Sequence, residues 1–212
     1  SIMAEKEAEI SSKLHPLKLA LEVQEAMSSK DWLVIDGGNT HFWSEIAVNM
    51  AGWRGKKLKG ILHPGAFSML GVGVPFALAA KLKNPEDNVV VISGDGAFLS
   101  GGLSIEATFQ EKAPITVVID NNGGLTTISQ QQERLFGHKK HVATDFRDIP
   151  FHSMFEGLGG HGELVESLEQ LRPALKRAIE CGKTACVNVR TQGAISPIVL
   201  ATTNKRDKAS IE

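Results

Sequence analysis

Four short apolar runs, rich in β-branched residues, recur along the chain and limit the folds that it can adopt. They are WLVID (32–36), NVVVIS (88–93), ITVVID (115–120) and ACVNVR (185–190). Their hydrophobicity is continuous rather than alternating, which is typical of strands covered on both faces, as in parallel sheets. We therefore expect these runs to form strands inside the molecule, between two layers of helices.

Segments with a helical spacing of apolar residues lie before and between these runs, at residues 16–29, 71–82, 102–113 and 167–182. The last segment carries signals at both ends, because Ser167 and Gln170 form an S-x-x-Q capping box and Gly182 stands where a helix terminates. The alternation of strands and helices predicts an α/β fold, with a doubly wound, mostly parallel sheet and helices on both faces.

The chain of 212 residues suits one such domain, which we place at residues 14–200 between a flexible leader (1–13) and a tail (201–212). A net charge of −1 and a pI near 6.7 give no indication of a nucleic acid or a membrane surface as partner. No apolar run reaches the ~18 residues that a membrane span needs. Cys181 and Cys186 have no metal-ligating neighbours, so we expect free thiols and a cytoplasmic location.

A carboxylate between two glycines follows the second run directly, in Gly94-Asp95-Gly96. Glycines at a strand–helix junction let the backbone approach a phosphate, which a bare carboxylate would repel. Asn122 follows the third run, 27 residues after Asp95, so both side chains should emerge at the same edge of the sheet. Carboxylate and amide oxygens are ligands for Mg²⁺, whose shell is often completed by phosphates. A divalent cation between Asp95 and a phosphate would remove the repulsion.

The G-D-G and N-N motifs at this spacing resemble those of the thiamine-diphosphate-dependent enzymes. These enzymes include acetolactate synthase, benzaldehyde lyase, oxalyl-CoA decarboxylase and 2-hydroxyacyl-CoA lyase. DGGNTHFW (36–43) is similar to the first diphosphate loop of that family, and HPGAFSMLGVGVPFALAAKL (63–82) is similar to the segment that holds the aminopyrimidine ring. Because the three motifs follow the family order, the chain is identified as resembling the C-terminal, diphosphate-binding domain of these enzymes, and that domain only.

The resemblance implies that Mg²⁺ is bound by the side chains of Asp95 and Asn122 and by the backbone carbonyl of Gly124. It implies cofactor contacts at Gly38, Asn39, Thr40, His41, Ser68, Leu70, Gly94, Gly96, Ala97 and Leu125. Ser68 and Leu70 would position the cofactor, the first through its carbonyl and the second as an apolar support. His63 is a candidate active-site group, although a structural histidine is the alternative, and we assign no catalytic residue to the chain itself.

The sequence also departs from its relatives. Ala97 stands where many of them have serine, Ser68 where they usually have glycine, and Gln131 where acetolactate synthase carries a substrate-selecting tryptophan. The last difference makes an ordinary acetolactate synthase a poor match.

Active sites of this family are completed by a second, pyrimidine domain, whose glutamate protonates the aminopyrimidine ring. The resemblance therefore implies a thiamine-diphosphate- and Mg²⁺-binding subunit of a two-chain lyase or carboligase, assembled with a separate pyrimidine-domain subunit as a heterotetramer or larger complex. Such an enzyme makes or breaks a C–C bond next to a carbonyl in a 2-oxoacid, aldehyde or acyl-CoA. Two alternatives stay open: an excised domain of a single-chain enzyme, and a cofactor-binding module without catalysis.

Residues 121–141 are expected to form a substrate-side loop, because they leave the predicted metal site and are rich in small polar residues. His138 and His141 precede Asp145 closely and allow a second metal site, but we favour a solvated loop. The chain lacks a G-x-x-x-x-G-K-[ST] motif, and GDGAFL fails the dinucleotide pattern G-x-G-x-x-G, which disfavours ATP and NAD as ligands.

Overall fold

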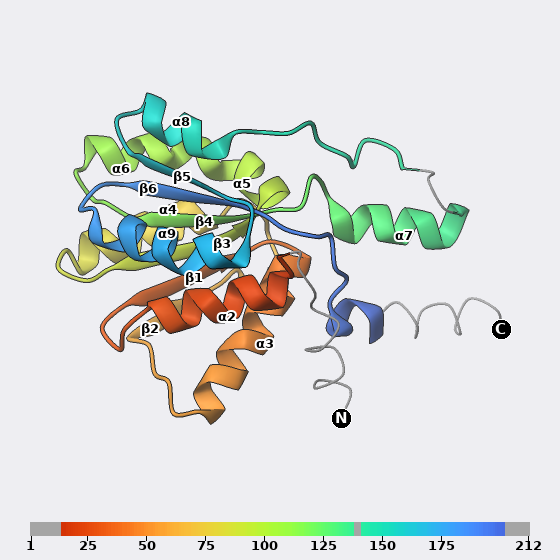
Figure 1. Ribbon diagram of the computed structural model, residues 1–212, viewed down its shortest axis with the longest axis horizontal. Coiled ribbons are helices and arrows are strands. Elements are labelled where there is room, and N and C mark those ends of the chain that lie inside the picture. The colour runs from red at the N-terminus through yellow and green to blue at the C-terminus, as the bar shows by residue number, and fades with distance from the viewer. Residues whose placement is uncertain (1–13, 138–140, 202–212) are drawn as a thin grey trace.

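The computed structural model describes residues 14–137 and 141–201, and the core of this part is a six-stranded sheet (Figure 1). All neighbouring strands are parallel, in the order β2-β1-β3-β4-β6-β5. The strands are β1 (Trp32–Asp36), β2 (Gly60–Leu62), β3 (Val89–Gly94), β4 (Thr116–Asn121), β5 (His161–Val165) and β6 (Ala185–Arg190). The predicted parallel α/β sheet is confirmed. The proposed leader and residues 202–212 of the proposed tail lie outside the described residues.

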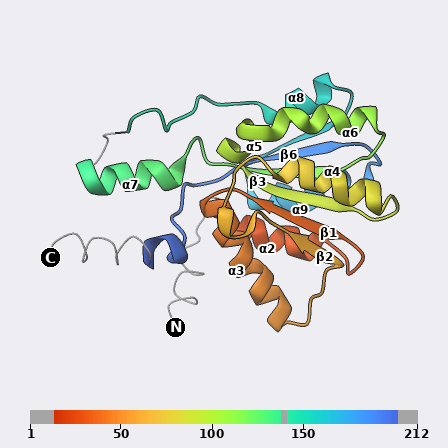
Figure 2. The ribbon, with the colours of Figure 1, turned by 180° about the vertical axis from the view of Figure 1, so that it is seen from behind.

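Helices cover both faces of the sheet, and each face has its own buried cluster (Figures 1 and 2). One face carries α2 (Pro16–Ala26), α3 (Asn39–Trp53) and α9 (Leu168–Glu180). The other carries α4 (Gly73–Lys83), α5 (Asp95–Gly101), η2 (Gly102–Ile105), α6 (Glu106–Gln110) and α8 (Phe151–Gly157). Successive strand residues belong to opposite clusters: Leu33 is in the cluster that includes α2 and α9, whereas Val34 is in the cluster that includes α4 and α8. This is why the runs read as continuously apolar.

The helix ends follow their sequence signals most closely in α9. Both halves of the capping box of Ser167 and Gln170 are present. The helix ends at Glu180 with Cys181 as its C-cap, and the next residue, Gly182, has a φ of +68°, the left-handed conformation that favours glycine. The other predicted helices are present with shifted bounds, and the segment expected to be one helix at 102–113 is divided between η2 and α6.

Two strands and four α-helices were not predicted, and one of these helices is α5, which follows β3 directly. β2 has only three residues, and β5 (HGELV) is an edge strand with mostly half-buried residues, so neither shows the continuous apolar pattern. Helix α3 begins inside the first diphosphate loop, at Asn39. The remaining two are the short α8 and α7 (Thr126–Phe136), which replaces most of the expected loop at 121–141.

Helix α7 projects beyond the edge of the sheet at which the strands end, and the chain returns alongside it (Figures 1 and 2). At its base, Gly124 and Asp145 form an isolated antiparallel bridge. The N–H of Leu125 donates to the carbonyl of Thr144 at 2.8 Å, and the N–H of Phe146 donates to the carbonyl of Gly123 at 2.8 Å. These bonds join the start of α7 to the returning segment.

The ring of His141 joins α7 to the same returning segment further out. Its Nε2 lies 2.9 Å from Glu133 Oε1, and its Nδ1 lies 3.1 Å from Asp145 Oδ1. The two ring nitrogens therefore face different carboxylates, which fits an ion-paired link rather than a shared metal ligand set. His138 lies outside the described residues.

We expect this link to weaken as the pH rises. Hydrogen bonds to Asp145 and Glu133 raise the pKa of His141. A group whose folded-state pKa is raised contributes its full stabilisation below its unfolded pKa, about 6.5 for histidine, and loses it as the pH rises through the folded value. Protection of the α7 amides against hydrogen exchange, corrected for intrinsic rates, should therefore be lower at alkaline pH than at about pH 6.

His141→Gln should remove this pH dependence. The matched control is His161→Gln, because His161 pairs with Glu163 on another part of the molecule and should leave the pH dependence of α7 unchanged. Equal protection of α7 at both pH values in the unmodified chain would contradict the prediction.

No helix within residues 14–137 and 141–201 is both long enough and apolar enough to cross a bilayer.

Candidate functional site

A cavity of about 360 Å³ lies at the edge where the central strands end. Its walls come from the loops after β1, β3 and β4 and from the segment before α4. Every cofactor-binding and metal-binding residue expected from the sequence lines it: Gly38, Asn39, Thr40, His41, Ser68, Leu70, Gly94, Asp95, Gly96, Ala97, Asn122, Gly124 and Leu125. His63 is not part of the lining, but its ring centroid lies 5.4 Å from that of His41.

The strand register brings these residues together. Asp36 at the end of β1 is level with Ser93 in β3, and Gly94 at the end of β3 is level with Asp120 in β4. Since the three strands are parallel neighbours, the loops that follow them leave the sheet side by side. The strand register thus brings residues that are distant in sequence together around one cavity.

Asp95 is the most constrained group in the cavity. Asp95 is the first residue of α5 and is only 2% exposed. Oδ2 accepts hydrogen bonds from the N–H groups of Gly123 and Gly124, both at 2.9 Å, and Oδ1 accepts from Gly96 at 2.7 Å. Burial, together with the nearby Asp120, raises the pKa of Asp95 to about 7 in spite of these bonds. The carboxylate is therefore held in position, and no positively charged group within residues 14–137 and 141–201 contributes to lowering its pKa.

Asn122 presents an unusual atom. Its Oδ1 is buried and, among the described residues, is the only buried side-chain nitrogen or oxygen without a hydrogen-bond partner. Leaving such an atom unpaired costs on the order of 1–3 kcal/mol. The carbonyl of Gly124 accepts one bond, from the N–H of Thr126 at 2.9 Å, and keeps a second lone pair. The cavity thus offers a carboxylate, an unpaired amide oxygen and a backbone carbonyl.

Two further buried carboxyl groups lie at this edge and were not singled out from the sequence. Asp120 accepts from the hydroxyl groups of Thr40, at 2.7 Å, and Thr191. Asp36 accepts from the N–H groups of Gly71 at 3.1 Å and Gly73 at 2.8 Å. Burial raises the pKa of both carboxyl groups. Their signal in the sequence is that each apolar run, WLVID and ITVVID, ends in aspartate.

The side chains of the first diphosphate loop are engaged inside the protein. Asn39 Nδ2 donates to Gln130 Oε1 at 3.1 Å, and its Oδ1 accepts from the N–H of Ser196 at 3.1 Å. Thr40 is bound to Asp120. These bonds fix the start of α3, whose first-turn N–H groups have no acceptor within the helix. The loop can therefore offer backbone donors to an anion, rather than these side chains.

Glycines let the loops meet closely around the cavity. A Cβ at Gly96 would lie 2.4 Å from Leu125 Cδ2, and one at Gly101 would lie 2.1 Å from the carbonyl oxygen of Gly71. The second contact packs the end of α5 against the segment that carries Ser68 and Leu70. At Gly96 the obstacle is the end of the Leu125 side chain, which can rotate, whereas a side chain at Gly101 would meet backbone and would push the segment of Ser68 and Leu70 outward.

Ser68 has a left-handed backbone, with φ 48° and ψ 33°. This conformation costs a non-glycine residue about 1 kcal/mol or more. The structure thus gives a physical reason why glycine, which relatives usually have here, suits this position. Leu70 is partly exposed and contributes an apolar side chain to the cavity wall.

A comparison with known protein families decides the family membership. The family described as "Thiamine pyrophosphate enzyme, C-terminal TPP binding domain" matches residues 36–189. The chain belongs to this family. The match includes the loops after β1, β3 and β4, so every loop that contributes a predicted metal ligand lies within it.

Several curated proteins are similar to the chain. A "Probable acetolactate synthase" of Mycobacterium bovis is 34% identical over 185 residues, which are 86% of this chain and 32% of that protein. A "2-hydroxyacyl-CoA lyase 2" of Bos taurus is 32% identical over 174 residues, 80% of this chain and 26% of that protein. An "Acetolactate synthase" of Bacillus subtilis is 27% identical over 179 residues, 84% of this chain and 30% of that protein. The chain thus spans about a third or less of the length of these relatives. They support an enzyme family that uses thiamine diphosphate to make or break C–C bonds.

Proposed function

We propose that the chain binds thiamine diphosphate through a Mg²⁺ ion in this cavity. The ion would be held by the side chains of Asp95 and Asn122 and by the carbonyl of Gly124. The observation that carries the proposal is the buried Asn122 Oδ1, which has no partner among the described residues and lies in the same cavity as the buried carboxyl of Asp95. A hard cation would satisfy this oxygen and offset the charge of Asp95, and diphosphate oxygens and water would complete its shell.

The remaining contacts follow from the walls of the cavity. The N–H groups of Thr40 and His41 in the first turn of α3 and the N–H of Ala97 would donate to the diphosphate. Gly96, whose N–H already donates to Asp95, would let the diphosphate approach the backbone closely. Ser68 would accept a hydrogen bond at its carbonyl from the cofactor's amino group, and Leu70 would pack against the rings. Asp36 would keep that segment in place, because it accepts the N–H groups of Gly71 and Gly73. When bound, the cofactor supplies a nucleophilic carbon and stores the negative charge that forms when a substrate carbonyl is attacked.

We further propose that a separate pyrimidine-domain subunit completes the active site, in a heterotetramer or larger complex. Support comes from exposed apolar side chains beside the cavity, on two segments that Gly71 and Gly101 hold together. Phe67 is 94% exposed and Leu103 is 79% exposed, and Met69, Leu70 and Leu99 add to this surface. Apolar side chains that gather at one place favour a protein partner.

The complex would act as a lyase or carboligase on a 2-oxoacid, an aldehyde or an acyl-CoA. The names of the similar proteins, acetolactate synthase and 2-hydroxyacyl-CoA lyase, fit this range of substrates. We place it in the cytoplasm, in agreement with the two free cysteines, Cys181 and Cys186.

The test is reconstitution. Thiamine diphosphate is titrated calorimetrically into the chain, with and without Mg²⁺, first alone and then with a candidate pyrimidine-domain subunit. We expect Mg²⁺-dependent binding, and turnover of a 2-oxoacid only in the assembled complex, lost when the partner's glutamate is replaced by glutamine. Turnover only after covalent fusion to a pyrimidine domain would favour an excised domain, and binding without turnover would favour a non-catalytic module. No Mg²⁺-dependent binding in any assembly would refute the proposal.

A further inference from the structure

A second group of metal-ligating side chains lies beside the cavity. One of its members, His41, also lines the cavity, but the proposed Mg²⁺ and diphosphate contacts use only the backbone of the first turn of α3 and not this side chain. His41, Glu45 and His63 each offer one ligand atom, and the three atoms lie within 4.8 Å of one another. His41 Nε2 is 2.9 Å from Glu45 Oε1, and the ring of His63 stands edge-on to that of His41. Within residues 14–137 and 141–201 this is the one group of at least three histidine, cysteine or acidic residues with such spacing.

The fold builds this group from two elements. His41 and Glu45 are four residues apart on α3 and therefore face the same side of the helix. His63 follows β2, which pairs with β1, and α3 begins three residues after β1 ends. The bonds of Asn39 fix the start of the helix, so the position of the buried His41 is set by the fold.

We propose that His41, Glu45 and His63 bind a divalent transition-metal ion, with Zn²⁺ as the best match. Two imidazoles and one carboxylate, with a coordination position left open, are typical of catalytic zinc sites and related metal centres. Mg²⁺ prefers oxygen ligands, so the nitrogen-rich group and the proposed Asp95 site select different ions. Because His41 also lines the cavity, the ion would lie at the cavity wall.

The spacing requires only side-chain movement. Metal–nitrogen distances of about 2.0–2.1 Å place tetrahedral ligand atoms roughly 3.3 Å apart, so the widest separation must close by about 1.5 Å. Glu45 is partly exposed and His63 is exposed, so both can rotate. A bound ion would take the place of the proton in the hydrogen bond between His41 Nε2 and Glu45 Oε1. The hydrogen bond from the N–H of Gly65 to His63 Nδ1 is long, at 3.2 Å, and is a weak restraint on that ring.

Other histidine–carboxylate pairs in the chain show why this one is different. Glu163, the partner of His161, is also bound by the guanidinium of Arg177 at 2.7 Å and is already neutralised. The carboxylates around His141 face opposite ring nitrogens and cannot share one ion with it. Among the described residues, Glu45 has no lysine or arginine within ion-pairing distance, and a second imidazole stands nearby.

The test uses metal binding alone and needs neither cofactor nor partner. Co²⁺ is titrated into the purified chain in excess Mg²⁺, with visible d–d absorption as the readout, and Zn²⁺ is then added as a competitor. We expect one equivalent of Co²⁺ to bind, to give the bands of a low-coordinate nitrogen–oxygen site and to be displaced by Zn²⁺. His63→Ala and Glu45→Gln should each weaken Zn²⁺ binding by at least about tenfold, since loss of an outer-shell partner alone can have that effect.

Two controls separate this site from others. His161→Ala removes the histidine of another histidine–glutamate pair, and this variant should bind Co²⁺ like the unmodified chain. Asp95→Asn should also retain this binding, because it affects only the proposed Mg²⁺ site. The inference is overturned if less than one equivalent binds, if neither His63→Ala nor Glu45→Gln weakens binding, or if Asp95→Asn abolishes it. Both test positions are at least partly exposed, and circular dichroism checks that the variants are folded.

Discussion

Asp95→Asn should lower the affinity for thiamine diphosphate in the presence of Mg²⁺ by at least about 100-fold, because it removes the only carboxylate from the proposed ligand set. Asparagine keeps a side-chain oxygen that can still accept from Gly123 and Gly124. Alanine would leave three N–H groups without their acceptor. Calorimetric titration of the cofactor, with and without Mg²⁺, measures the effect.

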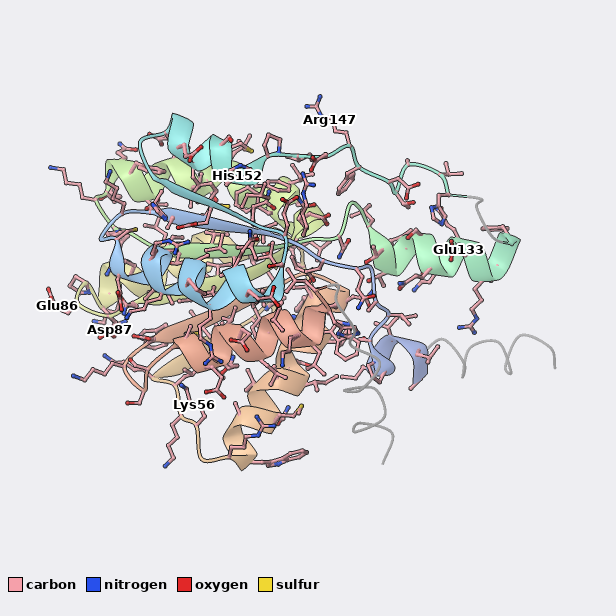
Figure 3. All side chains as sticks on the ribbon, viewed as in Figure 1. Lys56, Glu86, Asp87, Glu133, Arg147 and His152 are labelled. Carbon is pink, nitrogen blue, oxygen red and sulfur yellow. The ribbon has the colours of Figure 1, made fainter. Side chains whose placement is uncertain are left out.

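The same substitution should not destabilise the chain without ligand. The raised pKa of Asp95, about 7, means that the ionised carboxylate is unfavourable in the folded state at higher pH. The neutral amide removes this penalty, so we expect a thermal midpoint at pH 8 equal to or above that of the unmodified chain. Asp87→Asn is the matched control for the affinity measurement and should bind the cofactor like the unmodified chain. Asp87 lies at the opposite end of the molecule from Glu133 and α7 (Figure 3). Unchanged Mg²⁺-dependent affinity in Asp95→Asn would contradict the assignment.

Gly101→Ala should destabilise the fold by about 1–3 kcal/mol, the range typical of overpacking. The new Cβ would lie 2.1 Å from the backbone oxygen of Gly71, and backbone cannot move aside as a flexible side chain can. Separation of the two segments would also displace Ser68 and Leu70 from the cavity wall. Chemical denaturation measures the stability, and cofactor titration should show a weaker affinity.

Gly52→Ala is its control. Gly52 lies inside α3, with nothing within 4 Å of a new Cβ, so alanine should stabilise the chain there by about 0.5–1 kcal/mol. If both variants were equally stable, the close packing of Gly71 against Gly101 would be wrong.

The sequence predicts the central sheet well and its periphery poorly, for a physical reason. Strands β1, β3, β4 and β6 are covered on both faces, and their apolar runs are visible in isolation. β2 and β5 lie at the edges, where exposed positions remove that pattern. Helix α7 has mostly half-buried or exposed residues, so its polar sequence resembles that of a loop.

The candidate site was predictable as a set of positions but not as a network of contacts. Strand order and spacing placed Asp95 and Asn122 at one edge, and the structure has them line one cavity. The internal bonds of Asn39 and Thr40 depend on Gln130, Ser196 and Asp120, which come from distant segments. The unpaired oxygen of Asn122 depends on every neighbour of that atom, so no local pattern could indicate it.

The hydrogen bonds from Gly123 and Gly124 to Asp95 have a consequence for α7. The two glycines stand immediately before this helix, and Gly124 pairs with Asp145 on the returning segment. A ligand that binds Asp95 would therefore lie next to the two residues that connect β4 to the projecting helix α7. By thermodynamic linkage, a ligand whose binding favours one orientation of α7 binds more tightly when α7 is held in that orientation. A partner protein that binds the outer part of α7 could in this way change the affinity of the cavity for its ligand without contacting the cavity.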